Sequence, residues 1–164
     1  MMARARVRLG LLPIIVVLSA CFGGGGSPIT GSGKGFPELK IEFPPVVEAG
    51  STETATINVT NPGPEELPSL LITFALVGTE TPLVTIGSDG SNPSIAGVEP
   101  EPVGVSDDGV IYRFGGLEEG ESVELAFDIV IPDVRGPVAN SVTVTDGNDV
   151  ERARGVRLET VVRG

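Results

Sequence analysis

Residues Thr54–Thr60 read TATINVT, and this short stretch decides the fold class. Alanine, isoleucine and valine occupy every second position, while threonine and asparagine occupy the positions between them. Side chains on a β-strand alternate between the two faces of the sheet, so this spacing predicts a strand with one apolar and one polar face. Residues Ser122–Ile131 repeat the alternation, with valine, leucine, phenylalanine and isoleucine on one face. Together the two stretches indicate a half-buried sheet.

Further strands are predicted between clusters of turn residues. Leu70–Val77 is apolar on both faces, which is typical of a central strand. Asp108-Gly109 is a hairpin-turn dipeptide, and it predicts that Val103–Ser106 pairs with Val110–Phe114. The turn residues DGND at 146–149 likewise predict a hairpin at the C-terminus.

The pattern of short strands predicts one domain over residues 36–164. Beyond the N-terminal segment, no stretch of roughly 12 residues has helical periodicity. We therefore expect an all-β fold, an immunoglobulin-like two-sheet β-sandwich of about seven to nine strands. The chain has a single cysteine, so its hydrophobic core must stabilise the domain without an internal disulfide.

The N-terminal segment ends at that single cysteine, Cys21. Three arginines come first, then about a dozen mostly apolar residues, which is the order of a signal peptide and too short for a membrane span of roughly 18 residues. The last four residues of this segment, Leu18-Ser19-Ala20-Cys21, resemble the lipobox of bacterial lipoproteins. The resemblance implies that residues 1–20 are removed as a lipoprotein signal peptide. It also implies that Cys21 carries a diacylglyceryl group.

Residues 21–35 contain the cysteine and a flexible linker. Phe22–Gly35 reads FGGGGSPITGSGKG, a composition typical of a flexible tether. The lipoprotein resemblance implies that membrane lipid is the partner of Cys21 and that the protein is located in the bacterial cell envelope. Because Phe22, and not aspartate, follows the cysteine, it implies the outer membrane in a host with two membranes. In a host with one membrane, the anchor would lie on the outer face of the cell membrane.

The exported part of the chain is strongly acidic. Without the three arginines of residues 1–20 it has 8 basic and 22 acidic residues, a net charge of −14. Such a surface repels nucleic acid and anionic lipid, so we expect no nucleic-acid partner. The only basic cluster is Arg152, Arg154 and Arg157, which we expect to balance nearby acidic side chains on an edge strand. Partner binding is the alternative role for this cluster.

Two regions carry a likeness to a known surface domain. One is Glu48–Pro64, reading EAGSTETATINVTNPGP, and the other comprises Tyr112–Leu117, Gly120–Ser122 and Asn140–Thr145. They resemble the bacterial surface repeat called domain of unknown function eleven, and they are similar to cell-adhesion-related modules. The resemblance implies an immunoglobulin-like fold with a binding or adhesion role. Only one copy is present, so a filament built by repetition is not expected.

The residues needed for common catalytic chemistry are missing. The chain has no histidine, and lipidation would remove its only thiol. Paired acids such as Asp107-Asp108 and Glu118-Glu119 leave glycosidase chemistry formally open, but each pair lies next to a glycine in turn-like sequence. Tryptophan is absent and Tyr112 is the only tyrosine, so an aromatic platform for sugars is not expected. We therefore expect that the protein is not an enzyme.

Calcium is the ligand that the acidic turns could hold. Asp146, Asn148, Asp149 and Glu151 place four oxygen-bearing side chains within six residues, and calcium prefers oxygen ligands. The same residue types also form ordinary turns, so both interpretations stay open. No other cofactor is predicted.

The sequence thus leads to three hypotheses. The first is a lipid-anchored cell-envelope protein whose sandwich serves non-enzymatic binding, adhesion or assembly with an envelope protein or a glycan. The alternative is a carbohydrate-active module or weak glycosidase. The third is a passive structural or spacer domain.

Overall fold

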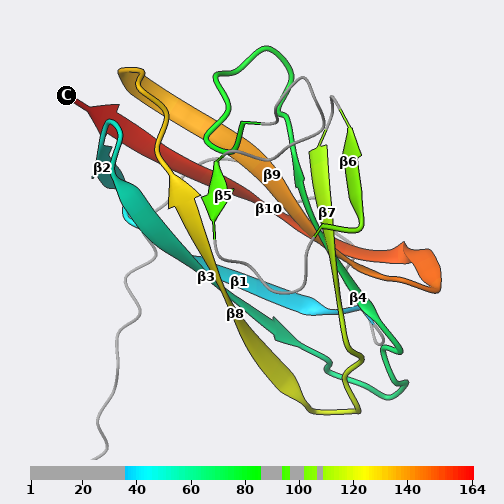
Figure 1. Cartoon of the computed structure of the whole chain (residues 1–164). Helices are drawn as coiled ribbons and strands as arrows, with labels where there is room; N and C mark the ends of the chain where they lie inside the picture. Colours follow the sequence, from blue (N-terminus) through cyan, green and yellow to red (C-terminus); the bar gives the residue numbers. More distant parts are fainter. Residues whose placement is uncertain (1–35, 86–93, 97–101, 107–108) are drawn as a thin grey trace, which may run out of the picture.

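The computed structural model describes residues 36–85, 94–96, 102–106 and 109–164, which form two β-sheets packed face to face (Figure 1). This confirms the predicted all-β, immunoglobulin-like sandwich. The four-stranded sheet has the order β1 (Glu38–Glu42), β3 (Thr52–Thr60), β8 (Ser122–Val130), β5 (Ile95–Ala96). The six-stranded sheet has the order β2 (Val46–Glu48), β10 (Asp149–Arg163), β9 (Gly136–Asp146), β4 (Leu70–Ala75), β7 (Gly109–Phe114), β6 (Gly104–Ser106).

The two strands with the clearest alternation lie side by side at the centre of the four-stranded sheet. β3 pairs with β8 in antiparallel register, with Ala55 opposite Phe127 and Ile57 opposite Leu125. Ala55, Ile57 and Phe127 are fully buried, whereas the threonines between them on β3 point outward. The period-2 pattern therefore predicted both the strands and the face that each one buries.

The central strand and both hairpins are also confirmed. β4 lies between β9 and β7, and it ends at Ala75, two residues earlier than predicted. β6 pairs with β7, with Val105 opposite Val110. β9 and β10 form the long C-terminal hairpin.

The described residues form ten strands, slightly more than predicted, because several very short strands are added at the sheet edges. β5 has two residues and β2 has three, too few for any periodicity to be seen in the sequence. β2 pairs with the end of β10 in parallel, with Val46 opposite Val161. Pairing of this kind depends on residues more than 100 positions apart in the chain, so local sequence does not predict it.

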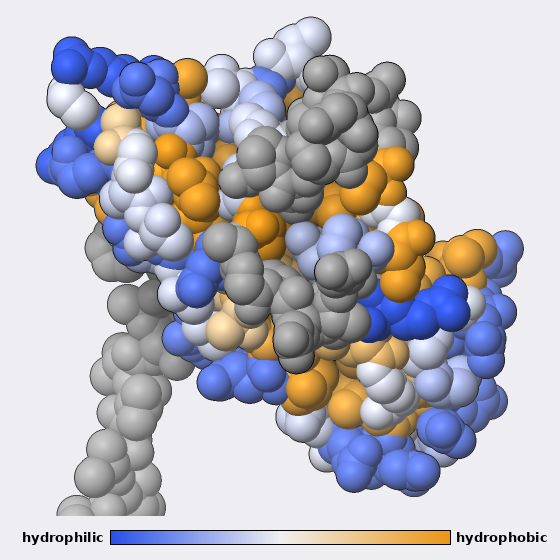
Figure 2. Space-filling view, in the orientation of Figure 1, coloured by the Kyte–Doolittle hydropathy of each residue, from blue (hydrophilic) through white to orange (hydrophobic). Residues whose placement is uncertain are grey.

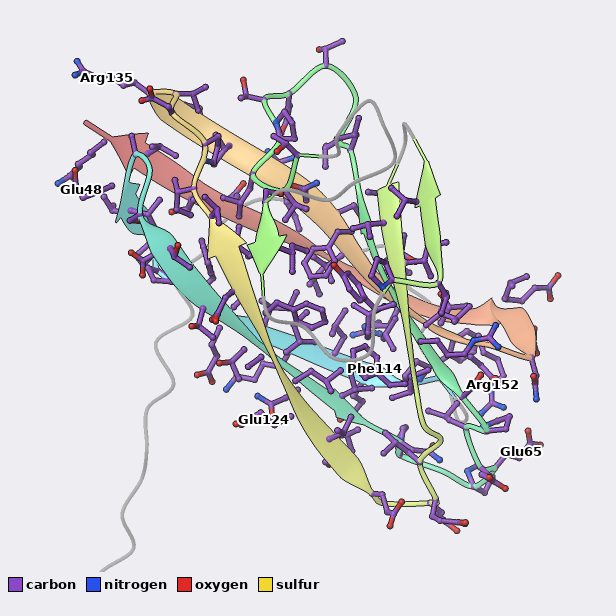
Figure 3. The ribbon with its side chains drawn as sticks, viewed as in Figure 1. Glu48, Glu65, Phe114, Glu124, Arg135 and Arg152 are labelled. Atoms are coloured by element: carbon purple, nitrogen blue, oxygen red, sulfur yellow. The ribbon has the colours of Figure 1, made fainter. Side chains whose placement is uncertain are left out.

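Aromatic rings fill the space between the sheets. The ring of Phe127 lies 5.1 Å from that of Phe74, 5.3 Å from that of Tyr112 and 6.1 Å from that of Phe114, measured between centroids, and all three contacts are edge-to-face. This geometry stabilises aromatic pairs. Figure 3 shows Phe114 between the two sheets, and Figure 2 shows hydrophobic side chains along the middle of the molecule with hydrophilic ones toward its ends.

Two buried asparagines connect loops to the core. The side-chain oxygen of Asn140 accepts a hydrogen bond from the N–H of Val84 at 2.7 Å, and its amide donates to the carbonyl of Ala75 at 3.1 Å. Asn61 accepts a bond from the N–H of Gly63 and donates to the carbonyl of Leu117. Buried polar groups need such partners, so both residues are part of the structure of the loops.

Gly63 has a close-packing role in the Asn61 turn. Its φ is +75°, and a Cβ atom there would lie 2.5 Å from the Cγ of Glu119. A side chain at this position would therefore meet both backbone strain and a steric clash. The residues that carried the family resemblance thus have a structural explanation in this turn.

Candidate functional site

The lipidation site lies outside the described residues. Cys21, the lipobox residues Leu18, Ser19 and Ala20, and the linker through residue 35 all fall in that part of the chain. The domain boundaries at residues 20 and 35 therefore stay predictions. Within the described residues, no helix has the length and apolar character needed to cross a membrane.

The residues proposed for calcium are engaged in other interactions. Asp146 is buried at the end of β9, and its carboxylate accepts hydrogen bonds from the N–H of Asn148 at 2.9 Å and from Nη1 of Arg152 at 3.0 Å. Asp149 accepts a bond from the N–H of Glu151 at 3.1 Å, as in an ordinary turn. Among the described residues, no group of three or more histidine, cysteine, aspartate or glutamate side chains is arranged to hold a metal ion. The geometry thus favours the turn interpretation of this loop.

We expect millimolar calcium to leave the melting temperature of the protein unchanged. A ligand that binds the folded state raises the melting temperature, and Asp146 would have to leave Arg152 before it could ligate calcium. A thermal melt with calcium, compared with one in magnesium and one with chelator, measures this. A calcium-specific upward shift that an Asp146→Asn variant lacks would contradict the expectation.

Two of the three arginines of the cluster on β10, Arg152 and Arg157, pair with acidic side chains, as the sequence predicted for them. Arg152 pairs with Asp146 and lies 3.6 Å from Glu65, and Figure 3 shows Arg152 and Glu65 at the same end of the sandwich. Arg157 pairs with Glu80 and with Glu159, the latter at 2.6 Å. Hydrogen bonds to these two glutamates raise the pKa of Arg157 above its ordinary value, so its guanidinium stays charged.

The candidate residues for a carbohydrate site that the structure describes form neither an aromatic platform nor a pair of acids in a cleft. Tyr112 is only 2 % exposed and packs in the core, so its ring offers no platform for a sugar. Glu118 and Glu119 are both exposed in the turn before β8, where the N–H of Glu118 donates to the carboxylate of Glu121. Asp107 and Asp108 lie outside the described residues.

The outer face of the four-stranded sheet is charged. Glu38, Lys40 and Glu42 on β1 and Glu124 and Asp128 on β8 flank the threonines of β3. Thr54 donates to Asp128 at 2.6 Å across this face. Figure 3 shows Glu124 directed away from the other sheet. This is the well-solvated surface expected of a highly acidic domain.

The outer face of the six-stranded sheet differs because its centre carries no charge. Register and alternation place small hydroxyl and aliphatic residues side by side across four strands, with Thr73 opposite both Thr143 and Ile111. We call this surface the neutral face, and its members are Leu71, Thr73, Ala75, Ile111, Ser141, Thr143, Thr145, Ala153 and Gly155. All of them are half-buried except Gly155, which is buried. Arg113 lies at its border and is exposed.

A groove of about 620 Å³ lies at one end of this sheet, near the C-terminal part of β10. Its lining includes Pro45, Glu80, Pro137, Arg157, Glu159 and Val161. Val161 is 44 % exposed, and it lies opposite Pro137 on one side and opposite Val46, which is 37 % exposed, on the other. An exposed apolar row thus adjoins the ion pairs of Arg157.

Sequence reasoning found neither the neutral face nor the groove. It predicted most of the strands that build them, but not their order in the sheet. The one local indication was the run of threonine, serine and alanine at outward positions of Leu70–Ala75 and Gly136–Asp146. Which outward positions become neighbours depends on pairing between distant segments.

Comparisons with known proteins were made by sequence family, by curated relatives and by structure. No family model matches the chain, so the resemblance to domain of unknown function eleven has no support from this comparison. No curated protein matches it either.

Solved structures with a similar arrangement of strands include three of different kinds. A CARDB domain from Pyrococcus furiosus, in complex with di-metal ions, is 15% identical, with a TM-score of 0.46 over 82% of this chain and 95% of that one. A cohesin module of a family 33 glycoside hydrolase from Clostridium perfringens is 16% identical, with a TM-score of 0.42 over 80% and 98%. A β-glucosidase from Listeria innocua, in complex with isofagomine, is 13% identical, with a TM-score of 0.40 over 82% and 17%. At such low identities and scores, what these proteins bind is no guide to this chain.

Proposed function

We propose that this protein is a lipid-anchored cell-envelope protein whose β-sandwich acts as a non-enzymatic binding module for another envelope protein. The observation that carries the proposal is the neutral face of the six-stranded sheet. It is a continuous uncharged surface on a chain whose exported part has a net charge of −14.

The neutral face has the composition of a protein-binding surface. The centres of protein interfaces are depleted of charged residues, because a charge is costly to remove from water. Thr73, Thr143 and Ile111 lie at the centre of the face, whereas the matching positions of the other sheet are flanked by acidic residues. A partner could therefore cover the neutral face at a lower desolvation cost than any other broad sheet surface of the described residues.

Lipidation of Cys21 would present this surface near the membrane. Two acyl chains give stable attachment, at about 0.8 kcal/mol for each buried methylene group. A glycine-rich tether of 14 residues has a root-mean-square span of about 20 Å, so the domain could turn its neutral face toward a neighbouring protein. An envelope protein is favoured over a glycan because the only tyrosine is buried in the core.

Thr143→Glu and Thr56→Glu form a matched pair of variants that tests the proposal. Both threonines are half-buried at outward positions of interior strands, Thr143 on the neutral face and Thr56 on the charged face. We expect chemical crosslinking in intact cells to trap a specific envelope protein with the wild-type chain and with Thr56→Glu. We expect Thr143→Glu to reduce this product at least about tenfold, since it introduces a charge into the interface.

The same two variants provide the contrary outcome. If crosslinking yields no specific product, or if both variants lose the product equally, the neutral face is not the binding surface. Thermal melts of both variants show whether either substitution has unfolded the domain.

A further inference from the structure

The groove at the end of β10 combines an apolar floor with charged walls. The floor includes Val161 and Pro137, which lie opposite each other on β10 and β9 and are exposed. Val46, opposite Val161 on β2, continues this exposed apolar row beyond the groove. Pro45 extends the floor at the edge of the sheet. Binding sites commonly have this construction, in which apolar surface supplies affinity and a few polar groups fix orientation.

The charged walls of the groove are two glutamates on either side of an arginine. Arg157 donates from Nη2 to Oε2 of Glu80 and from Nε to Oε2 of Glu159. No hydrogen bond to Oε1 of either glutamate is formed by the described residues, and each glutamate side chain is 46 % exposed. The three side chains carry a net charge of −1, so one cationic group can be added without excess positive charge.

We propose that this groove binds an extended polypeptide segment carrying a lysine or arginine side chain. The cationic group lies between Glu80 and Glu159, and small apolar side chains of the segment cover Val161 and Pro137. This inference rests on the proposed binding function and specifies the chemistry of the partner. The groove adjoins the neutral face on the same side of the six-stranded sheet, because Arg157 lies opposite Ser141. One partner can therefore contact both.

Charge complementarity selects a basic segment as the occupant. The exported chain has a net charge of −14, which attracts cationic groups and repels a second copy of itself. The aliphatic stem of lysine or arginine also covers apolar surface while its charged group reaches the carboxylates. An anionic segment would have to displace a glutamate from Arg157.

Binding of a defined peptide tests the inference. The probe is a fluorescein-labelled peptide of sequence GAVKVAG with blocked ends, and its counterpart has norleucine in place of lysine. Fluorescence anisotropy is measured with the full chain in nonionic detergent. We expect saturable binding of the lysine peptide and at least about tenfold weaker binding of the norleucine peptide, because hydrogen bonds to charged groups are lost.

Two double variants separate the groove from the general field of the protein. The double variant Glu80→Gln, Glu159→Gln should weaken binding of the lysine peptide on the order of tenfold or more. Glu38→Gln with Glu124→Gln makes the same change in net charge on the other sheet and should alter binding less than about twofold, because distant exposed charges are screened by salt. All four glutamates are exposed, so folding should survive in both variants.

Several results would overturn the inference. One is the absence of saturable binding at millimolar concentrations of the lysine peptide. Another is an equal loss of peptide affinity in both double variants. A third is self-association of the wild-type chain that the Glu80→Gln, Glu159→Gln double variant abolishes. The last result would identify a second copy as the occupant. If Glu80→Gln with Glu159→Gln still crosslinks the envelope partner while Thr143→Glu does not, the binding function stands and only the groove assignment fails.

Discussion

Replacement of Phe127 with alanine should lower the free energy of unfolding by about 3 to 5 kcal/mol. Phe127 is fully buried on β8, and its ring contacts those of Phe74, Tyr112 and Phe114 edge to face. The substitution removes the apolar contacts of the ring and leaves a cavity between the sheets that rigid strands close only in part. Because the net stability of a domain is about 5 to 15 kcal/mol, this loss is a large fraction of the total.

Chemical denaturation measures the effect through the midpoint, with an unchanged slope if the unfolded state is unaltered. Phe43→Ala is the matched control. Phe43 is only partly buried at the border of the core, so its replacement with alanine should lower the free energy of unfolding by clearly less than that of Phe127. Equal costs for the two variants would show that the ring cluster is not the centre of the core.

The alternation of side chains predicted the strands of the core well. Thr54–Thr60 and Ser122–Ile131 are long enough for period 2 to be unambiguous, and the alternating apolar residues of each face the core as expected, although Val123 and Leu125 are only half-buried. The edge strands β2 and β5 are too short to carry any pattern, and pairing with distant strands alone forms them. The order of strands within each sheet is set by such non-local pairing.

The alternation of side chains along β9 also indicates that Asp146, at the start of the acidic turn 146–149, lies on the buried face of the strand. Val142, Val144 and Asp146 share one face of β9, and that face is buried. A carboxylate on a buried face needs a partner within the protein, and Arg152 supplies it. Composition alone left calcium binding and an ordinary turn both open, whereas the register of the strand favours an ion pair.

The neutral face and the groove were beyond sequence reasoning for a different reason. Thr73, Thr143 and Gly155 come from three segments that are separated along the chain and become neighbours only through the order β10-β9-β4. Each is an ordinary strand residue by itself. Their lack of charge becomes a property of a surface only once the sheet has formed, and it stands out because the opposite sheet displays four acidic residues.

Substitution of Cys21 by alanine should release the protein from membranes almost completely without unfolding it. The lipoprotein resemblance assigns the diacylglyceryl group to this residue, and two acyl chains are enough for stable attachment. A surface with a net charge of −14 is repelled by anionic lipid. Cys21 is followed by a glycine-rich tether, so its side chain should contribute nothing to the stability of residues 36–164.

Membrane fractionation, together with metabolic labelling by an alkyne fatty acid, measures the release. An uncleaved leader would hold the variant by its apolar segment, so the Cys21→Ala chain is exported behind an ordinary secretory leader and its N-terminus is checked by mass spectrometry. Ser19→Ala is the control, because it keeps a small residue in the lipobox and should retain both the label and the membrane location. If the wild-type chain takes up no label, or the trimmed Cys21→Ala chain still sediments with membranes, the anchor lies elsewhere. In that case the binding module would have to be held in the envelope by its neutral face or its groove. Thr143→Glu would release it in the first case, and Glu80→Gln with Glu159→Gln in the second.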